Sequence, residues 1–177
     1  MFGWFKKKER GIAVTDLIFM GTPAKHRRLL AMAQQEQPPV FVCWFEETAE
    51  AVAQFFADNQ VHNITVALPR EAAQHRAAAY VFCEHHPSFK TEQQYFQQLA
   101  LTEALVVSAL DEALFTAFGG NRIISLMKSL GLEEDEPVSH AMVSASIKKA
   151  QEKTDNKLTG MEQPARSQEE WMKRNVG

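Results

Sequence analysis

The residues best suited to chemistry are Glu84, His85 and His86, which stand together directly before Pro87. Histidine changes its charge near neutral pH and ligates metal ions, so the cluster is a candidate metal or proton-transfer site. Residues 70–86 are rich in alanine and predict a helix that Pro87 ends. Adjacent histidines on a helix point in different directions, and a protonated histidine near a helix C-terminus is favourable by itself. We therefore favour a structural role and keep the metal or proton-transfer role as the alternative.

A second candidate is the acidic pair Glu46 and Glu47, which follows the apolar run of residues 40–45. Such a run is typical of a buried parallel strand, and α/β sheets carry ligand sites where these strands end. Acidic residues also stabilise the first turn of a helix, and residues 46–60 predict one. Both interpretations stay open. The acidic residues 133–136 are expected only to be solvated.

Glycine-rich phosphate loops are absent from the sequence. No glycine is followed by lysine, which excludes a P-loop, and the common dinucleotide, zinc-protease and hydrolase patterns are missing too. Gly119 and Gly120 follow residues of helical pattern, whereas a phosphate loop follows a strand, so they predict a turn between helices. Cys43 and Cys83 lack metal-ligand spacing and are expected to be buried free thiols. We expect no catalytic residue, metal or cofactor.

The charge balance and the N-terminal residues limit the partners. The 177 residues include 19 Lys and Arg against 22 Asp and Glu, a net charge of −3 that gives no general attraction to nucleic acid. The first residues combine aromatic side chains with lysines, which favour a membrane interface, although folding of these residues onto the domain explains them as well. No apolar run approaches the ~18 residues that span a bilayer, and no signal peptide is expected. The candidate contact residues of this arm are Phe2, Trp4, Phe5, Lys6 and Lys7.

Short apolar runs alternate with amphipathic segments through the first two thirds of the chain. The alternation predicts strands at residues 14–20, 40–45, 63–68 and 103–110, and helices at 24–35, 46–60, 70–86 and 91–99. Strands alternating with helices indicate a parallel α/β sheet with helices on both faces. Beyond Asp111 the pattern is helical only, with Asn121 and Ser139 as the expected N-caps.

We divide the chain into four parts. They are an N-terminal arm (residues 1–12), an α/β domain (13–110), a helical segment (111–155) and a polar tail (156–177). The tail has few apolar side chains and is expected to be mobile. Within it, Ser167 and Glu170 have the spacing of a capping box before Trp171 and Met172. We expect a short helix there that docks on another surface, with Trp171 and Met172 as candidate interaction residues.

Residues 110–153 resemble SecA, the ATPase motor of bacterial preprotein translocation, at an ordered series of spaced positions. In SecA this stretch runs from a strand through Phe-Gly and Arg-Ile or Arg-Val to a Met-x-x-Leu-Gly helix, an acidic loop and a helix with Ala-Gln-x-Lys. The resemblance implies a RecA-like fold, that of the family's second motor domain, followed by the start of its helical scaffold. The matching positions are Leu110, Asp111, Glu112, Leu114, Phe118, Gly119, Arg122, Ile123, Met127, Leu130, Gly131, Glu136, Pro137, Val138, His140, Ile147, Ala150, Gln151 and Lys153.

The resemblance stops at the nucleotide site. The family's ATP-binding arginines lie in glycine-containing segments just before the matching stretch, but residues 82–107 contain neither arginine nor glycine. These 177 residues also contain no counterpart of the family's first motor domain, which carries the P-loop. ATP hydrolysis needs a phosphate cradle and cationic stabilisation of the transition state, so ATPase activity is not expected.

These observations lead to one favoured hypothesis and two alternatives. The favoured one is a short, degenerate, stand-alone and non-catalytic SecA-like domain that acts through protein contacts in preprotein translocation, on SecA or another Sec component. One alternative is a degenerate ATP or ADP site near residues 45–48 and 68–70, where the sheet would carry ligands. The other is a structural relic with an unrelated protein partner. We expect a cytoplasmic location, with weak peripheral contact at the inner membrane as a variant, and no nucleic acid as a partner.

Overall fold

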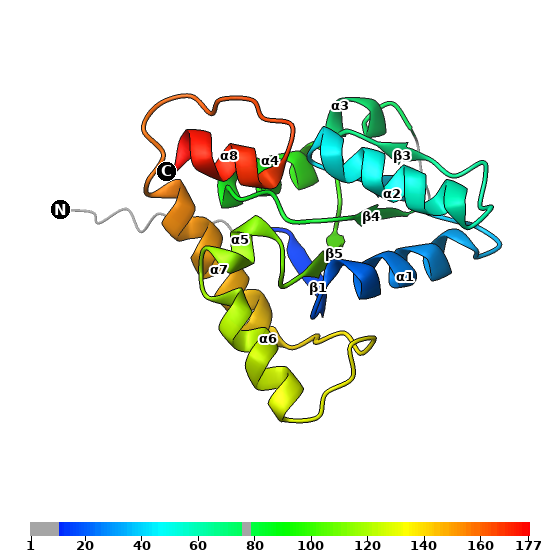
Figure 1. Cartoon of the computed structure of the whole chain (residues 1–177). Coiled ribbons are helices and arrows are strands. Elements are labelled where there is room, and N and C mark those ends of the chain that lie inside the picture. The colour runs from blue at the N-terminus through cyan, green and yellow to red at the C-terminus, as the bar shows by residue number, and fades with distance from the viewer. Residues whose placement is uncertain (1–10, 76–78) are drawn as a thin grey trace.

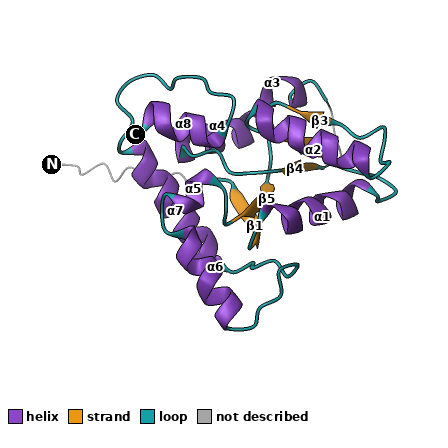
Figure 2. Cartoon of the chain, in the orientation of Figure 1, coloured by secondary structure: helices purple, strands orange, loops and turns teal. Residues whose placement is uncertain are grey.

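The computed structural model describes residues 11–75 and 79–177. Within these residues, the centre of the fold is a sheet of five parallel strands in the order β1-β5-β4-β2-β3 (Figure 2). The longest pairing joins the first and last strands in sequence, with Ala13 opposite Glu103 and Phe19 opposite Ala109. Because all strands run the same way, they end at one edge, called the carboxyl edge below. The strands are β1 (Ala13–Phe19), β2 (Val40–Val42), β3 (Val66–Ala67), β4 (Tyr80–Phe82) and β5 (Glu103–Ala109).

Helices cover both faces of this sheet (Figure 1). On one face, α1 (Thr22–Ala33) and α2 (Glu46–Asp58) bury apolar side chains such as Val52 and Phe56, which lie one helical turn apart. On the other face, α3 (Pro69–Ala72) and α4 (Phe89–Gln98) contribute Ala72, Tyr95 and Phe96. The predicted class, an α/β fold of RecA-like type with a parallel sheet flanked by helices, is confirmed.

The helix predicted at residues 70–86 is wrong beyond its first turn. α3 ends at Ala72, and residues 80–82 form β4, which lies between β5 and β2. Val81 and Phe82 are 4% and 0% exposed. Alanine favours a helix locally, but the burial of branched and aromatic side chains on both faces of the sheet outweighs this small preference.

Helices alone follow β5 in the described chain, as the pattern beyond Asp111 predicted. The first three are α5 (Ala113–Thr116), α6 (Gly120–Ser129) and α7 (Ala141–Asp155). Phe115, Met127 and Ile147, one from each helix, pack around Ile18 of β1 in a third apolar cluster. A single antiparallel bridge from Ile18 to Val138 ties the loop after α6 to the edge of the sheet.

The caps of α6 and α7 differ from the prediction. Gly119, and not Asn121, is the N-cap of α6, with a φ of 92° that glycine adopts at little cost. His140, and not Ser139, is the N-cap of α7, because its Nδ1 accepts a hydrogen bond from the Met142 backbone N–H at 3.1 Å. Both caps lie within two residues of the expected position.

The last segment of the chain folds back over the domain (Figure 1). It contains α8 (Gln168–Asn175), which contacts α5, and Ser167 caps it by accepting a hydrogen bond from the Glu170 N–H, as the capping-box spacing indicated. Trp171 is 2% exposed, so the predicted short helix docks on this domain itself.

Among the described residues, no helix is both long and apolar enough to cross a membrane. The candidate contact residues of the N-terminal arm, Phe2 to Lys7, lie outside the described residues.

Candidate functional site

The sequence-predicted cluster Glu84, His85 and His86 lies at the carboxyl edge, directly beyond β4. The interpretation that it ends a helix is therefore wrong, because the chain leaves a central strand at this point. The three residues are 2%, 1% and 6% exposed. Their three side chains contact different groups of residues, so no two of them are placed to bind the same ion or ligand.

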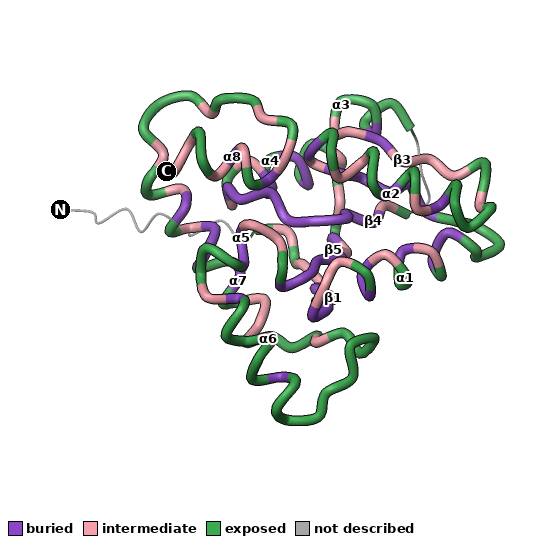
Figure 3. The backbone as a smooth tube through the Cα atoms, viewed as in Figure 1, coloured by how far each residue is buried: buried purple, intermediate pink, exposed green. Residues whose placement is uncertain are grey.

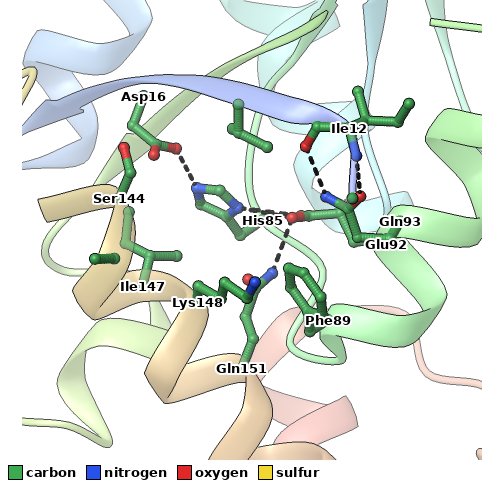
Figure 4. Close-up of a pocket in the computed structure, with 13 residues that line it drawn as sticks. Ile12, Asp16, His85, Phe89, Glu92, Gln93, Ser144, Ile147, Lys148 and Gln151 are labelled. Carbon is green, nitrogen blue, oxygen red and sulfur yellow. Dashed lines mark hydrogen bonds and ion pairs between the residues drawn. The ribbon is translucent and has the colours of Figure 1, made fainter. Parts of the chain in front are cut away.

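His85 is held between two buried carboxylates from distant parts of the chain (Figure 4). Its Nε2 lies 2.8 Å from Asp16 Oδ1 on β1, and its Nδ1 lies 3.1 Å from Glu92 Oε2 on α4. Glu92 also accepts hydrogen bonds from the His86 backbone N–H and from Gln151 Nε2, both at 2.9 Å. Asp16 and Glu92 are 2% and 1% exposed. We call Asp16, His85 and Glu92 the carboxylate–histidine cluster.

The carboxylates fix the charge of His85. Burial alone lowers the pKa of the imidazole, but Glu92 and Asp16 outweigh burial and raise this pKa to about 10. At neutral pH both ring nitrogens therefore carry a proton and donate to carboxylates. Such a ring has no lone pair for a metal or a proton. Within the described part of the chain, no group of three or more His, Cys, Asp or Glu side chains could hold a metal ion.

A cavity of about 200 Å³ opens beside this cluster, between the start of β1, α4 and α7. Phe89 and Lys148 lie at its side, and the Lys148 ammonium is 4.7 Å from the centre of the Phe89 ring (Figure 4). All polar atoms of the His85 ring and of Glu92 that face it are already engaged by protein groups. The cluster thus joins β1, β4, α4 and α7 as a structural ion network.

The second polar centre is a cleft of about 510 Å³ at the carboxyl edge. Its floor holds Lys25 of α1, whose ammonium donates to Glu112 Oε1 at 2.7 Å and to the Cys83 carbonyl oxygen at 2.8 Å. Glu84 and Glu47 line the same cleft. The sequence indicates Glu47 by its place after a strand and Glu84 by its place beside two histidines, but it does not indicate Lys25 and Glu112 as residues of this cleft.

The charges in this cleft depend on one another. Burial opposes the charge of Lys25, but the nearby carboxylates of Glu112 and Glu84 raise its pKa above the ordinary value. Burial raises the pKa of Glu84 to about 7, and Lys25 reduces that rise. One buried cation faces two buried carboxyl groups, so Glu84 takes up a proton close to neutral pH.

Two of the helices that begin at this edge, α1 and α2, have a protein carboxylate at the N-terminus. The Thr22 N–H and hydroxyl of α1 donate to the two carboxylate oxygens of Asp111, each at 2.9 Å. At α2, Glu84 accepts hydrogen bonds from the Phe45 N–H at 3.3 Å and from the Thr48 hydroxyl at 2.8 Å. Helix N-termini are the places where α/β proteins bind phosphate. Here a protein carboxylate already accepts from one backbone N–H at the start of each of these two helices.

The C-terminal segment covers part of the same edge. Gln168 of α8 accepts a hydrogen bond from the Leu114 N–H at 2.7 Å and donates to the His85 carbonyl oxygen at 2.9 Å. Arg166 pairs with Glu46 at 2.8 Å and with Glu50 at 3.1 Å. Glu46 therefore serves an ion pair inside the chain. The predicted ligand pair Glu46 and Glu47 is split, since only Glu47 lines the cleft.

His86 occupies an aromatic pocket. Its ring lies 5.0 Å from the Trp44 ring, 5.1 Å from the Trp171 ring and 5.9 Å from the Phe45 ring, centre to centre. Burial lowers the pKa of His86, although Glu162 works against this shift. The neutral ring packs as an aromatic side chain. The candidate interaction residue Trp171 is thus buried against His86, while Met172 is half-buried.

The remaining residues that the sequence analysis considered have structural roles or lie at the surface. Gly119 ends the predicted turn between α5 and α6 and Gly120 begins α6, where a Cβ on Gly120 would lie 2.5 Å from the Leu110 carbonyl oxygen. Cys43 and Cys83 are buried free thiols, as predicted. Residues 133–136 are exposed, as expected of solvated acidic residues.

No family model matches the sequence. Among curated proteins, SecA 1 of Clostridioides difficile is 25% identical over 158 residues, which cover 87% of this chain. The chain is related in sequence to part of SecA. SecA 1 of Alkaliphilus metalliredigens is 38% identical over 53 residues, or 30% of this chain, and SecA of Acinetobacter baumannii is 43% identical over 47 residues, or 27%. The matched regions span 16%, 6% and 5% of these SecA proteins, so the relationship to SecA covers only a part of them.

Proposed function

We propose that this SecA-related chain is a non-catalytic domain that acts through protein contacts in preprotein translocation. The observation that carries the proposal is the pair of internal carboxylates at the N-termini of α1 and α2. Asp111 accepts from the Thr22 N–H at the start of α1, and Glu84 accepts from the Phe45 N–H directly before α2, so each carboxylate uses one backbone donor that a phosphate could use. Similarity to SecA supplies the link to translocation.

Charge argues in the same direction. A nucleotide at the carboxyl edge would bring phosphate charges into a cleft that contains Glu47, Glu84, Asp111 and Glu112. Lys25 is buried there, but Glu112 already pairs with it. Phosphoryl transfer depends on free cationic groups that stabilise the transition state. This cleft repels the substrate of an ATPase.

The partner surface lies away from the α8 docking site. Trp171 is covered by the domain itself, which removes it from the surface that a partner would meet. We propose SecA or another Sec component as the partner, with a cytoplasmic location and weak peripheral contact at the inner membrane. The N-terminal residues Phe2, Trp4, Phe5, Lys6 and Lys7 are the candidates for that membrane contact.

Two measurements on the purified full chain test the proposal. Titration calorimetry with ATP and with ADP, each with and without Mg²⁺, is expected to give no binding heat at millimolar nucleotide. Biolayer interferometry against purified SecA and against the purified Sec channel is expected to give saturable binding to one of them. Nucleotide binding would contradict the proposal and favour the alternative of a degenerate ATP or ADP site. Failure to bind either Sec component would also contradict it and favour the alternative of a structural relic with an unrelated partner.

A further inference from the structure

A continuous apolar stripe runs along α6 and is left uncovered by the rest of the described chain. Ile123, Leu126 and Leu130 are 47%, 57% and 69% exposed. Phe118 before the helix and Leu132 after it are 36% and 42% exposed. In Figure 3, α6 and the loop after it are drawn almost entirely as exposed. We call these five residues the α6 stripe.

The spacing of these residues places the stripe along one side of α6. Residues 123, 126 and 130 follow the three- and four-residue steps that line up along one side of a helix. Met127, which is 7% exposed, lies beside the stripe on the same face and packs into the cluster around Ile18, together with Ile124. α6 therefore has one broad apolar face, and only one margin of it is covered within the described chain. Exposed apolar patches rimmed by charge are typical of protein interfaces.

Opposite charges stand at the two ends of the α6 stripe. Arg122 lies at the Phe118 end, and the Lys153 ammonium is 5.9 Å from the Phe118 ring centre. At the Leu132 end lie four consecutive acidic residues, two of which are paired inside the chain, Glu134 with Lys128 and Asp135 with Arg27. The other two acidic residues, Glu133 and Glu136, and also Arg122, have no ion-pair partner in the described part of the chain.

We propose that the α6 stripe binds the α6 stripe of a second copy of this chain, with the two helices antiparallel about a two-fold axis near Leu126. A two-fold interface uses the same patch on both subunits, so the patch must complement itself. Antiparallel pairing places the basic end of each copy against the acidic end of the other and covers the apolar residues between them. An unrelated partner would have to supply both charges at matching spacing. The inference is independent of the role in translocation.

Sedimentation equilibrium on the full chain tests the apolar part of this interface. The unaltered chain is expected to show a monomer–dimer equilibrium. Leu126→Asp is expected to raise the dimer dissociation constant by roughly 100-fold or more, since a two-fold interface buries the new charge twice. Met161→Asp is the matched control, because Met161 is 95% exposed and lies outside the stripe. It is expected to leave the equilibrium unchanged.

A charge exchange tests the orientation. Arg122→Glu alone and the double variant Glu133→Lys/Glu136→Lys alone place like charges against each other at both ends and are expected to weaken each homodimer. An equimolar mixture of the two restores opposite charges at both ends, so heterodimers are expected to form at concentrations where neither variant dimerises. These exposed substitutions leave the fold intact by circular dichroism if the interpretation is right.

Three results would overturn the proposal. The first is an unaltered chain that stays monomeric at every concentration. This result overturns the proposal even if another protein is found to bind the chain through Leu126. The second is a Leu126→Asp dimer as tight as the unaltered one. The third is a mixture of the two charge variants that forms no heterodimer, which excludes the antiparallel arrangement.

Discussion

His85 and Asp16 are 69 positions apart in the sequence, yet His85 Nε2 lies 2.8 Å from Asp16 Oδ1 with both side chains almost completely buried. The contact joins the residue after β4 to the first strand. Glu92 on the other side of the ring extends it to α4, and Gln151 extends it to α7. One imidazolium therefore links the sheet to the helical segment.

Replacing His85 by glutamine should destabilise the fold strongly. The variant leaves Asp16 and Glu92 as two buried carboxylates without a cation, a loss that typically costs about 3–5 kcal/mol. Urea unfolding followed by circular dichroism measures the change in the free energy of unfolding. His62→Gln at an exposed position is the control and should change it by no more than about 0.5 kcal/mol. An equal, small effect of both variants would show that the cluster holds no charged histidine.

Substituting Glu84 tests the protonation of the cleft. The pKa of Glu84 is about 7 in the folded chain against an ordinary value of 4.5, so the folded state holds the proton more tightly. The stability that this proton confers is complete below pH 4.5 and is lost as the pH rises through 7. Glu84→Gln cannot titrate, so its stability relative to the unaltered chain should improve between pH 4.5 and 7. Urea unfolding across this range measures the difference.

The control for this pH experiment is Glu36→Gln, at an exposed position. Its stability should follow the pH profile of the unaltered chain. If Glu84→Gln also follows that profile, Glu84 is ionised throughout the range and the cleft holds no proton near neutral pH.

The sequence predicts the parts of the fold that depend on neighbouring residues. The alternation of strands and helices, the turn at Gly119 and Gly120 and the cap at Ser167 all follow from local pattern and were predicted. β4 was missed because its three residues follow an alanine-rich stretch, and only the two covered faces of the sheet make them a strand. Local propensity is a weaker influence than burial of this kind.

The polar centres were less predictable for a related reason. Glu84, His85 and His86 attract attention as a group, but their partners Lys25, Asp16 and Glu92 are brought to them only by the strand order. None of these partners belongs to a recognisable pattern. One signal was available: Asp16 is the charged residue of the otherwise uncharged first strand, and a buried charge requires a partner.

Alanine at the two glycines should separate their roles. Gly120→Ala places a Cβ 2.5 Å from the Leu110 carbonyl oxygen, so we expect a loss of about 1–3 kcal/mol from overpacking. At Gly119 there is space for a Cβ, but the φ of 92° makes alanine cost about 1–2 kcal/mol. Asparagine tolerates a left-handed conformation, so Gly119→Asn should recover part of this loss while Gly120→Asn should not. Thermal unfolding of the four variants distinguishes strain from crowding, and recovery at Gly120 would contradict the close approach.

Trp171→Ala tests whether α8 is an integral part of the domain. The indole is 2% exposed and packs against His86, so its removal should cost about 3–5 kcal/mol in the free energy of unfolding. It should also make the loop at residues 156–167 more sensitive to limited proteolysis. Without a docked α8, the contacts of Gln168 with Leu114 and of Arg166 with Glu46 no longer hold this loop on the domain. Met161→Ala, at a side chain that is 95% exposed, is the control and should leave stability and cleavage unchanged. A Trp171→Ala chain as stable and as resistant as this control would mean that the C-terminal segment stays detached from the carboxyl edge and leaves the cleft open.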